Sequence, residues 1–164
     1  MPSRNSLPML VSPEAIPASA ALPYHFRAAA ANEPVAMNYL GAIYGRGTGV
    51  SKDNAAALEW FEKSASLGYG IAMANIGVHY QLGLGVPVDF SKARSWYEKC
   101  AGIGTATCMT DLGILYERGL DVPRNSELAR EWYEKAAAAG DDIAMTALKR
   151  LNSARSPASI PRQK

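Results

Sequence analysis

Apolar residues recur along the chain with the spacing of an amphipathic helix. Met37, Leu40 and Tyr44 fall at positions i, i+3 and i+7, which places all three on one face of a helix. The next segment has the same kind of spacing at Ala57, Trp60, Phe61 and Ala65. A glycine-rich stretch, GRGTGVSKD at residues 45–53, separates the two segments. This pattern predicts a helix, a turn and a second helix.

The helical hairpin recurs three times with a period of 36 residues and no insertion. The units cover residues 36–71, 72–107 and 108–143. Their coinciding positions include Gly41, Gly77 and Gly113, then Tyr44, Tyr80 and Tyr116, then Trp60, Trp96 and Trp132. Helical hairpins repeated at such a period stack into a solenoid. The sequence therefore predicts an all-α protein, an α/α superhelix of three hairpins with flanking capping helices.

Local signals set the predicted ends of the helices. Side chains at Asp53, Asp89 and Asn125 can cap each second helix, and Gly68, Gly104 and Gly140 suit its C-terminal end. Partial units at 18–35 and 144–152 complete a repeat domain of eight helices at residues 18–152. In the last unit, Lys149 and Asn152 replace the repeat's glycine and tyrosine, as an end cap requires. Residues 1–17 and the basic tail 153–164 are predicted to be disordered.

The repeated residues resemble the Sel-one-like repeat family, a relative of the tetratricopeptide repeats. The first unit carries the family pattern at Leu40, Gly41, Tyr44, Gly47, Gly49, Val50, Asp53, Ala57, Trp60, Lys63, Ala65 and Gly68. The third unit departs from the pattern, since Asp121 replaces the second loop glycine and Asn125 replaces the aspartate. The resemblance implies a superhelix whose first helices line the inner curve.

The glycine-rich loop also invites comparison with a phosphate-binding loop. A Walker loop needs a lysine directly after its last glycine, whereas Gly49 is followed by Val50 and Ser51. The same slot reads QLGLGV and ERGLDV in the later units. The loop is therefore interpreted as a hairpin turn, and no nucleotide or other cofactor is expected.

Composition narrows the possible partners. The formal net charge is +2, and the basic excess lies mostly in residues 149–164, so no basic stripe for nucleic acid is visible. No apolar run is long enough to span a membrane. Prolines interrupt the start of the chain where a secretory signal would need an apolar core. A cytoplasmic protein is expected, with an exported effector that lacks a classical signal peptide as the alternative.

Few residues could carry catalysis or bind a metal. The two histidines, His25 and His79, stand in no metal-ligand spacing, and no nucleophile motif is present. His79 takes an apolar position of its helix and is expected to be partly buried. The periodic tryptophans should pack between neighbouring hairpins, and the periodic methionines, ending with Met145, should belong to the core.

Cys100 and Cys108 are eight residues apart, at the end of one helix and the start of the next. Cysteine-rich members of the resembled family bridge adjacent helices at this separation, but in them every repeat carries the pair. Because only one repeat has it here and the compartment is expected to be reducing, free thiols are favoured. A weak enzyme acting on a β-lactam or a peptidoglycan fragment remains an alternative that rests on this pair alone.

The remaining candidate is a surface along the first helices, opposite their core positions. We expect a groove there, with an apolar floor and a polar rim, that binds a protein or peptide partner. Its expected residues are Asn38, Tyr39, Ala42, Arg46, Asn75, Val78, Gln81, Asp111, Ile114, Glu117 and Arg118.

Overall fold

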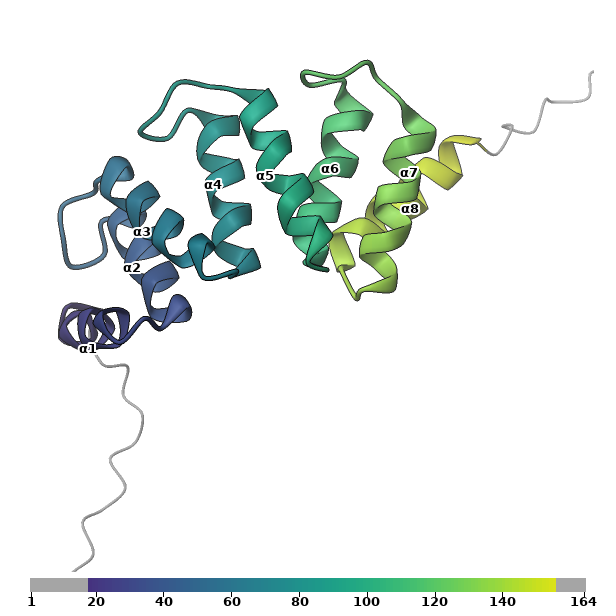
Figure 1. Cartoon of the computed structure of the whole chain (residues 1–164). Coiled ribbons are helices and arrows are strands. Elements are labelled where there is room, and N and C mark those ends of the chain that lie inside the picture. Colours follow the sequence, from purple (N-terminus) through teal and green to yellow (C-terminus); the bar gives the residue numbers. More distant parts are fainter. Residues whose placement is uncertain (1–17, 156–164) are drawn as a thin grey trace, which may run out of the picture.

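A computed structural model describes residues 18–155, and residues 1–17 and 156–164 lie outside the described residues. Eight helices and no strand make up the described range, which confirms the predicted all-α superhelix (Figure 1). The helices are α1 (Ala18–Ala30), α2 (Pro34–Arg46), α3 (Asn54–Ser66), α4 (Gly70–Leu82), α5 (Phe90–Gly102), α6 (Ala106–Arg118), α7 (Ser126–Ala138) and α8 (Asp142–Arg155). Helix α8 continues three residues past the predicted end at Asn152.

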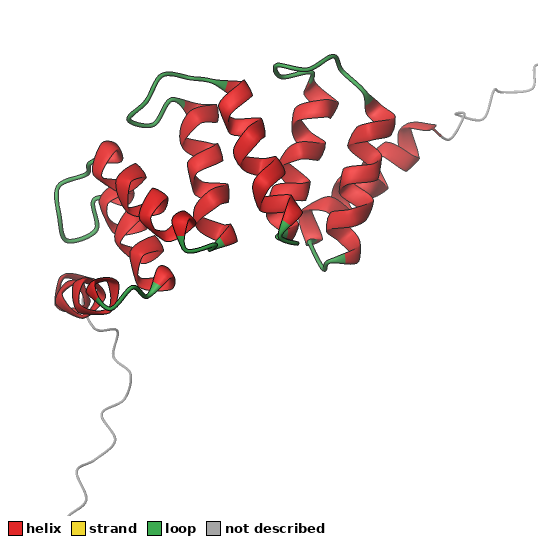
Figure 2. Cartoon of the chain, viewed as in Figure 1, coloured by secondary structure: helices red, strands yellow, loops and turns green. Residues whose placement is uncertain are grey.

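The helices form hairpins that stack in chain order. The pairs α2–α3, α4–α5 and α6–α7 are the three repeat units. Figure 2 draws in green the long connection within each unit and the short turns between units. Helix α1 precedes the array as a lone second helix, and α8 follows it as a lone first helix. The array arches from α1 to α8 (Figure 1).

Side-chain caps begin the second helices as the sequence predicts. The Asp53 carboxylate accepts hydrogen bonds from the backbone N–H groups of Ala55 and Ala56 at 3.0 and 2.9 Å. Asp89 and Asn125 cap α5 and α7 in the same way. Each cap satisfies N–H groups that the first helical turn leaves without a partner.

The first helices end at glycines in the left-handed backbone region, where a side chain is disfavoured. Gly47, for example, caps α2 with a φ of +72°. Asp121 keeps a left-handed φ of +59° at the position of the second loop glycine, so the departure from the repeat pattern leaves the backbone unchanged. Its carboxylate lies 3.9 Å from the Arg94 guanidinium on α5, an ion pair between neighbouring units.

A glycine in each first helix admits an aromatic ring from the second helix of the same unit. A Cβ atom on Gly41, Gly77 or Gly113 would lie 2.6, 2.3 or 2.5 Å from the ring of Phe61, Tyr97 or Tyr133, respectively. These rings are buried, with 4, 0 and 1% of their surface exposed. The repeated glycine therefore sets how closely the two helices of a hairpin approach.

The tryptophans pack between hairpins, as predicted. Trp60 contacts the cluster of Ala29, Ala36, Met37 and Leu40, which belongs to α1 and α2. The prediction that every periodic methionine lies in the core is wrong for Met145, which is 37% exposed. Met145 lies on α8, and the described chain has no further second helix to cover it.

The two cysteines form a disulfide that joins α5 to α6, so the prediction of free thiols is wrong. Both side chains are fully buried, and their Cα atoms lie 5.8 Å apart across the tight turn at residues 103–105. Small side chains fill the equivalent sites of the other units, namely Ser64 with Ala72 and Ala136 with Ala144. Free thiols were predicted from the expected reducing compartment, but the turn brings the two cysteines into contact.

Candidate protein-binding face

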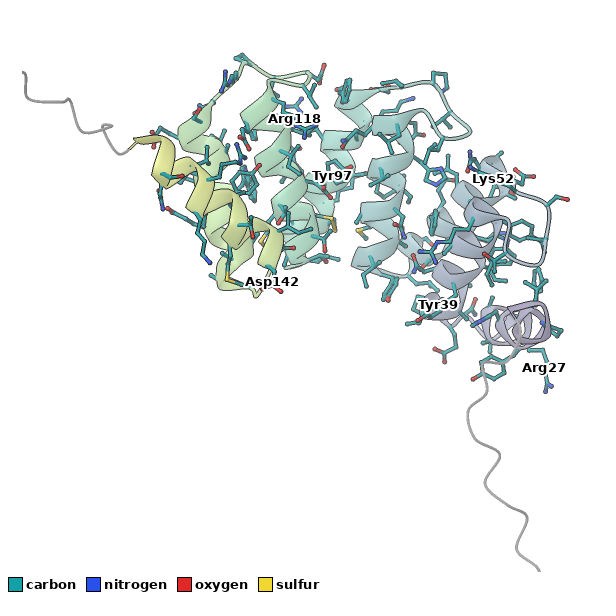
Figure 3. The ribbon with its side chains drawn as sticks, turned by 180° about the vertical axis from the view of Figure 1, so that it is seen from behind. Arg27, Tyr39, Lys52, Tyr97, Arg118 and Asp142 are labelled. Atoms are coloured by element: carbon teal, nitrogen blue, oxygen red, sulfur yellow. A yellow bond between two sulfur atoms is a disulfide. The ribbon has the colours of Figure 1, made fainter. Side chains whose placement is uncertain are left out.

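The candidate surface is formed by α2, α4, α6 and α8, and we call it the first-helix face. Figure 3 views the molecule from the side on which α8 lies in front. Two hollows lie on this face. The N-terminal hollow, between α2 and α4, has a volume of about 380 Å³, and the C-terminal hollow, between α6 and α8, has about 570 Å³.

The predicted groove residues divide between the two hollows. Six line the N-terminal hollow: Asn38, Tyr39, Ala42, Arg46, Asn75 and Val78. Three line the C-terminal hollow: Ile114, Glu117 and Arg118. Gln81 and Asp111 line neither hollow. The structure therefore shows two separate depressions rather than one groove with a continuous apolar floor.

The Gln81 side chain is engaged in a hydrogen bond within its own unit. The Tyr97 hydroxyl donates a hydrogen bond to the Gln81 side-chain oxygen at 2.9 Å. In the next unit the Tyr133 hydroxyl donates to Glu117 at 2.8 Å. Burial raises the pKa of both tyrosines, so both hydroxyls stay protonated and able to donate.

The first unit lacks this ring–acceptor pair. Phe61 takes the tyrosine position and has no hydroxyl, and Gly45 takes the acceptor position and has no side chain. Both residues line the N-terminal hollow. The sequence contains this signal, since tyrosine occurs with Gln or Glu and phenylalanine with glycine, but only contact between the positions gives it meaning.

The floor of the N-terminal hollow is apolar and carries no charge. His79 is 5% exposed, and its ring meets the Phe61 ring edge-on with centroids 5.4 Å apart. Its Nδ1 atom lies 2.8 Å from the carbonyl oxygen of Leu84, so a neutral ring protonated there donates a hydrogen bond. Burial lowers the pKa of His79 and thereby favours this neutral form. His79 is thus more fully buried than the expected partly buried histidine, and its Nδ1 atom has a hydrogen-bond partner.

Two amides bridge the helices at the rim of this hollow. The Asn75 side-chain NH₂ donates to the Asn38 side-chain oxygen at 2.9 Å, from α4 to α2. Tyr39, labelled in Figure 3, is 54% exposed beside them. Tyr39 also lines a third hollow of about 300 Å³ between α1 and α2, together with Tyr24 and His25.

An ion pair crosses the C-terminal hollow and ties α8 to α6. The Arg150 guanidinium contacts both carboxylate oxygens of Glu117, at 2.6 and 2.8 Å. This hydrogen-bonded arginine lowers the pKa of Glu117, against the opposing effect of burial. The arrangement holds Glu117 ionised and leaves Arg118, on the same rim, without a carboxylate partner of its own among the described residues.

Asp111 lies half-buried on α6. Burial and the nearby Asp141 carboxylate raise the pKa of Asp111 to about 7. Asn75 is the equivalent residue of the preceding unit, and it contacts Asn38 one unit earlier. Ala74 takes the Asn38 position relative to Asp111 and offers no polar group. Tyr97 of the preceding unit interacts electrostatically with Asp111, and this carboxylate adds to the burial that raises the pKa of Tyr97.

No metal or membrane chemistry is evident in residues 18–155. Within this range, no three His, Cys, Asp or Glu side chains gather as a metal site requires. None of the described helices combines the length and apolar character that a membrane span needs.

The stacked hairpins and the hollows on one face define a helical-repeat protein. Its units match the Sel1 repeat over residues 34–69, 70–101 and 106–141. The chain belongs to the Sel1 repeat family. Sel1 repeats generally mediate protein–protein interactions, and proteins built from them are typically scaffolds rather than enzymes.

Solved structures show the same architecture. A Sel1 repeat protein from Oxalobacter formigenes is 33% identical, with a TM-score of 0.76 over 80% of this chain and 54% of that one. A protective antigen from uropathogenic Escherichia coli strains, with an SLR fold, is 34% identical, with a TM-score of 0.74 over 81% of this chain and 28% of that one. Cysteine rich protein B of Helicobacter pylori, 23% identical, shares the fold with a TM-score of 0.62 over 80% of this chain and 97% of that one.

This chain thus spans about half of the Oxalobacter protein and about a quarter of the Escherichia coli antigen. A search of curated protein sequences finds no match.

Proposed function

We propose that this protein is an adaptor or regulatory scaffold whose first-helix face binds a segment of another protein. The observation that carries the proposal is the pair of hollows on this face, each with apolar residues beside polar groups at its rim. Concave sites of this size and lining suit side chains of a partner. Rigid, stacked hairpins hold the hollows at fixed positions, so a partner binds without ordering the scaffold.

A photo-crosslinking experiment tests which face binds. A photoreactive amino acid replaces Tyr39, on the first-helix face, or Ser95, exposed on α5, and crosslinks are identified by mass spectrometry in native lysate. The proposal expects a discrete partner from position 39, lost with Val78→Asp and Ile114→Asp, and none from position 95. Ser95→Asp is the matched control, because the other units carry glutamate at that position. Crosslinks from position 95 alone would overturn the proposal.

For location, we propose export to an oxidising compartment, the alternative to the expected cytoplasmic site. The Cys100–Cys108 disulfide supports export, because disulfides persist in oxidising environments and are rare in the cytosol. Alkylating free thiols in intact native cells tests this proposal. If the thiols react without prior reduction, the result would contradict export and support a cytoplasmic location.

A further inference from the structure

The N-terminal hollow lies where the first unit lacks two groups that the second and third units carry. The C-terminal hollow differs in kind, because Tyr133 and Glu117 line it and are hydrogen-bonded to each other. In the second and third units, the acceptor side chains of Gln81 and Glu117 reach across to a tyrosine hydroxyl. In the first unit, Gly45 leaves that space empty above the Phe61 ring. A Cβ atom at Gly45 would meet only the Cβ atom of Ala57, at 3.6 Å, so the helix itself has room for a side chain there.

The lining of this hollow carries one net charge. Arg46 is exposed at the end of α2, no acidic side chain lines the hollow, and His79 is held neutral by burial. Among the described residues no carboxylate pairs with Arg46. The charge that complements this rim is therefore negative.

The amide bridge supplies groups suited to a peptide backbone. Asn75 uses one N–H of its amide to reach the Asn38 oxygen, which leaves the Asn38 NH₂ and the Asn75 carbonyl oxygen available. These two residues are half-buried in the lining of the hollow, and the remaining donor and acceptor side by side match the C=O and N–H of an extended chain. Tyr39 flanks the pair and offers a ring for further contact.

We infer that the N-terminal hollow binds an internal segment of a partner protein in which a large apolar side chain stands close to an aspartate or glutamate. The apolar side chain fills the space above the Phe61 ring, the carboxylate contacts the Arg46 guanidinium, and the segment's backbone bonds to Asn38 and Asn75. This inference rests on the proposed function and names the chemistry of the partner. A charge-assisted contact with arginine is stronger than a neutral hydrogen bond, so the acidic residue contributes to selectivity.

Peptide selection on the immobilised full chain tests the inference. Short random peptides displayed on phage serve as the probe, and enriched sequences are synthesised with both ends capped, so that only side-chain carboxylates remain. We expect an enriched pattern of one large apolar residue with an acidic residue within a few positions. Replacing that acidic residue by its amide should weaken binding at least about tenfold.

Two variants of the protein locate the site. Gly45→Gln with Phe61→Tyr transplants the ring–acceptor pair of the second unit, fills the hollow, and should weaken peptide binding at least about tenfold while the fold is retained. Arg46→Leu, which installs the residue of the second unit at Leu82, should remove the preference for the acidic residue. Arg118→Leu is the matched control in the third unit and should leave peptide binding unchanged.

The outcomes separate this inference from the broader proposal. Peptide binding that is retained in Gly45→Gln/Phe61→Tyr but lost in Ile114→Asp would place the site in the C-terminal hollow. This result would overturn the inference and leave the proposed function intact. Binding only by peptides with a free C-terminus, selection without an acidic residue, or no selection at all would each overturn the inference. Loss with the double variant and with Arg46→Leu, but not with Arg118→Leu, would support it.

Discussion

Two glycines in equivalent first helices should respond to alanine in opposite directions. Gly77 lies against the buried Tyr97 ring, and a Cβ atom there would be 2.3 Å from a ring carbon. Gly45 faces the N-terminal hollow, and its Cβ atom would make an ordinary contact at 3.6 Å. Gly77→Ala should therefore destabilise the array, whereas Gly45→Ala should stabilise it.

The magnitudes follow from packing and helix propensity. Carbon atoms pack at roughly 3.5–4.0 Å, so the Tyr97 ring would have to move by more than about 1 Å to accept the new methyl group. Overpacking of this kind costs about 1–3 kcal/mol, and displacing the hydroxyl from Gln81 costs about 1 kcal/mol more. Alanine returns up to about 1 kcal/mol over glycine in a helix. The net expectation is a loss of about 2 kcal/mol at Gly77 and a gain of up to about 1 kcal/mol at Gly45.

Urea unfolding followed by circular dichroism measures both changes. Tyr97→Leu removes the ring, so Gly77→Ala in that background should cost little, and the double-mutant cycle should return a coupling of about 2 kcal/mol. A stabilising Gly77→Ala, or an equal cost with and without the Tyr97 ring, would refute the idea that the repeated glycine exists to admit the aromatic ring.

Three further predictions concern the disulfide, the buried carboxyl group and the glycine loop. Cys100→Ser with Cys108→Ala copies the first unit and should lower the unfolding free energy by about 2.5 kcal/mol, through lost loop-closure entropy; urea unfolding checks this, and no loss would count against a formed disulfide. Because the folded pKa of Asp111, about 7, lies above its ordinary 3.8, its ionisation destabilises the fold as the pH rises through this interval. Asp111→Asn should therefore gain on the order of 4 kcal/mol relative to wild type at pH 8 but not at pH 4, and equal effects at both pH values in chemical denaturation would contradict the raised pKa. Gly47→Val forces a branched side chain to a φ of +72° beside Lys52 and should cost about 2 kcal/mol, whereas adding ATP should leave the melting temperature of the wild type unchanged in calorimetry.

Most of the fold follows from local sequence signals. The i, i+3, i+7 spacing at Met37, Leu40 and Tyr44 specifies a helix face, and the capping oxygen of Asp53 specifies where the next helix begins. Such signals act within a few residues and recur every unit, so the stack is predictable from one chain. The exposure of Met145 was missed because the repeat register placed it with the other methionines, although the predicted array already ended in a lone first helix that no second helix covers.

The site was harder to predict because a helical period gives the direction of a side chain but not its partner. Periodicity correctly brought Asn38 and Asn75 to one face, yet it also counted Gln81, whose oxygen is taken by the Tyr97 hydroxyl. Asp111 was counted as rim and lines neither hollow. The prediction of free thiols failed for a related reason. The expected compartment says nothing about the contact that the turn between α5 and α6 creates between the two cysteines.

The capacity of this fold to bind a partner depends on where its units differ rather than on what they share. The shared glycine and aromatic ring build the same hairpin three times and leave similar space beside each first helix. What lines that space differs one turn later, at Gly45, Gln81 and Glu117. Gln81 accepts a hydrogen bond from tyrosine and lines neither hollow, whereas Glu117 accepts the same kind of bond and lines the C-terminal hollow. In the first unit, the absence of an acceptor side chain and of the hydroxyl at Phe61 leaves an apolar opening beside Arg46. Two residues of the first unit, Gly45 and Phe61, thus replace a polar contact between helices by an apolar lining in a candidate binding site.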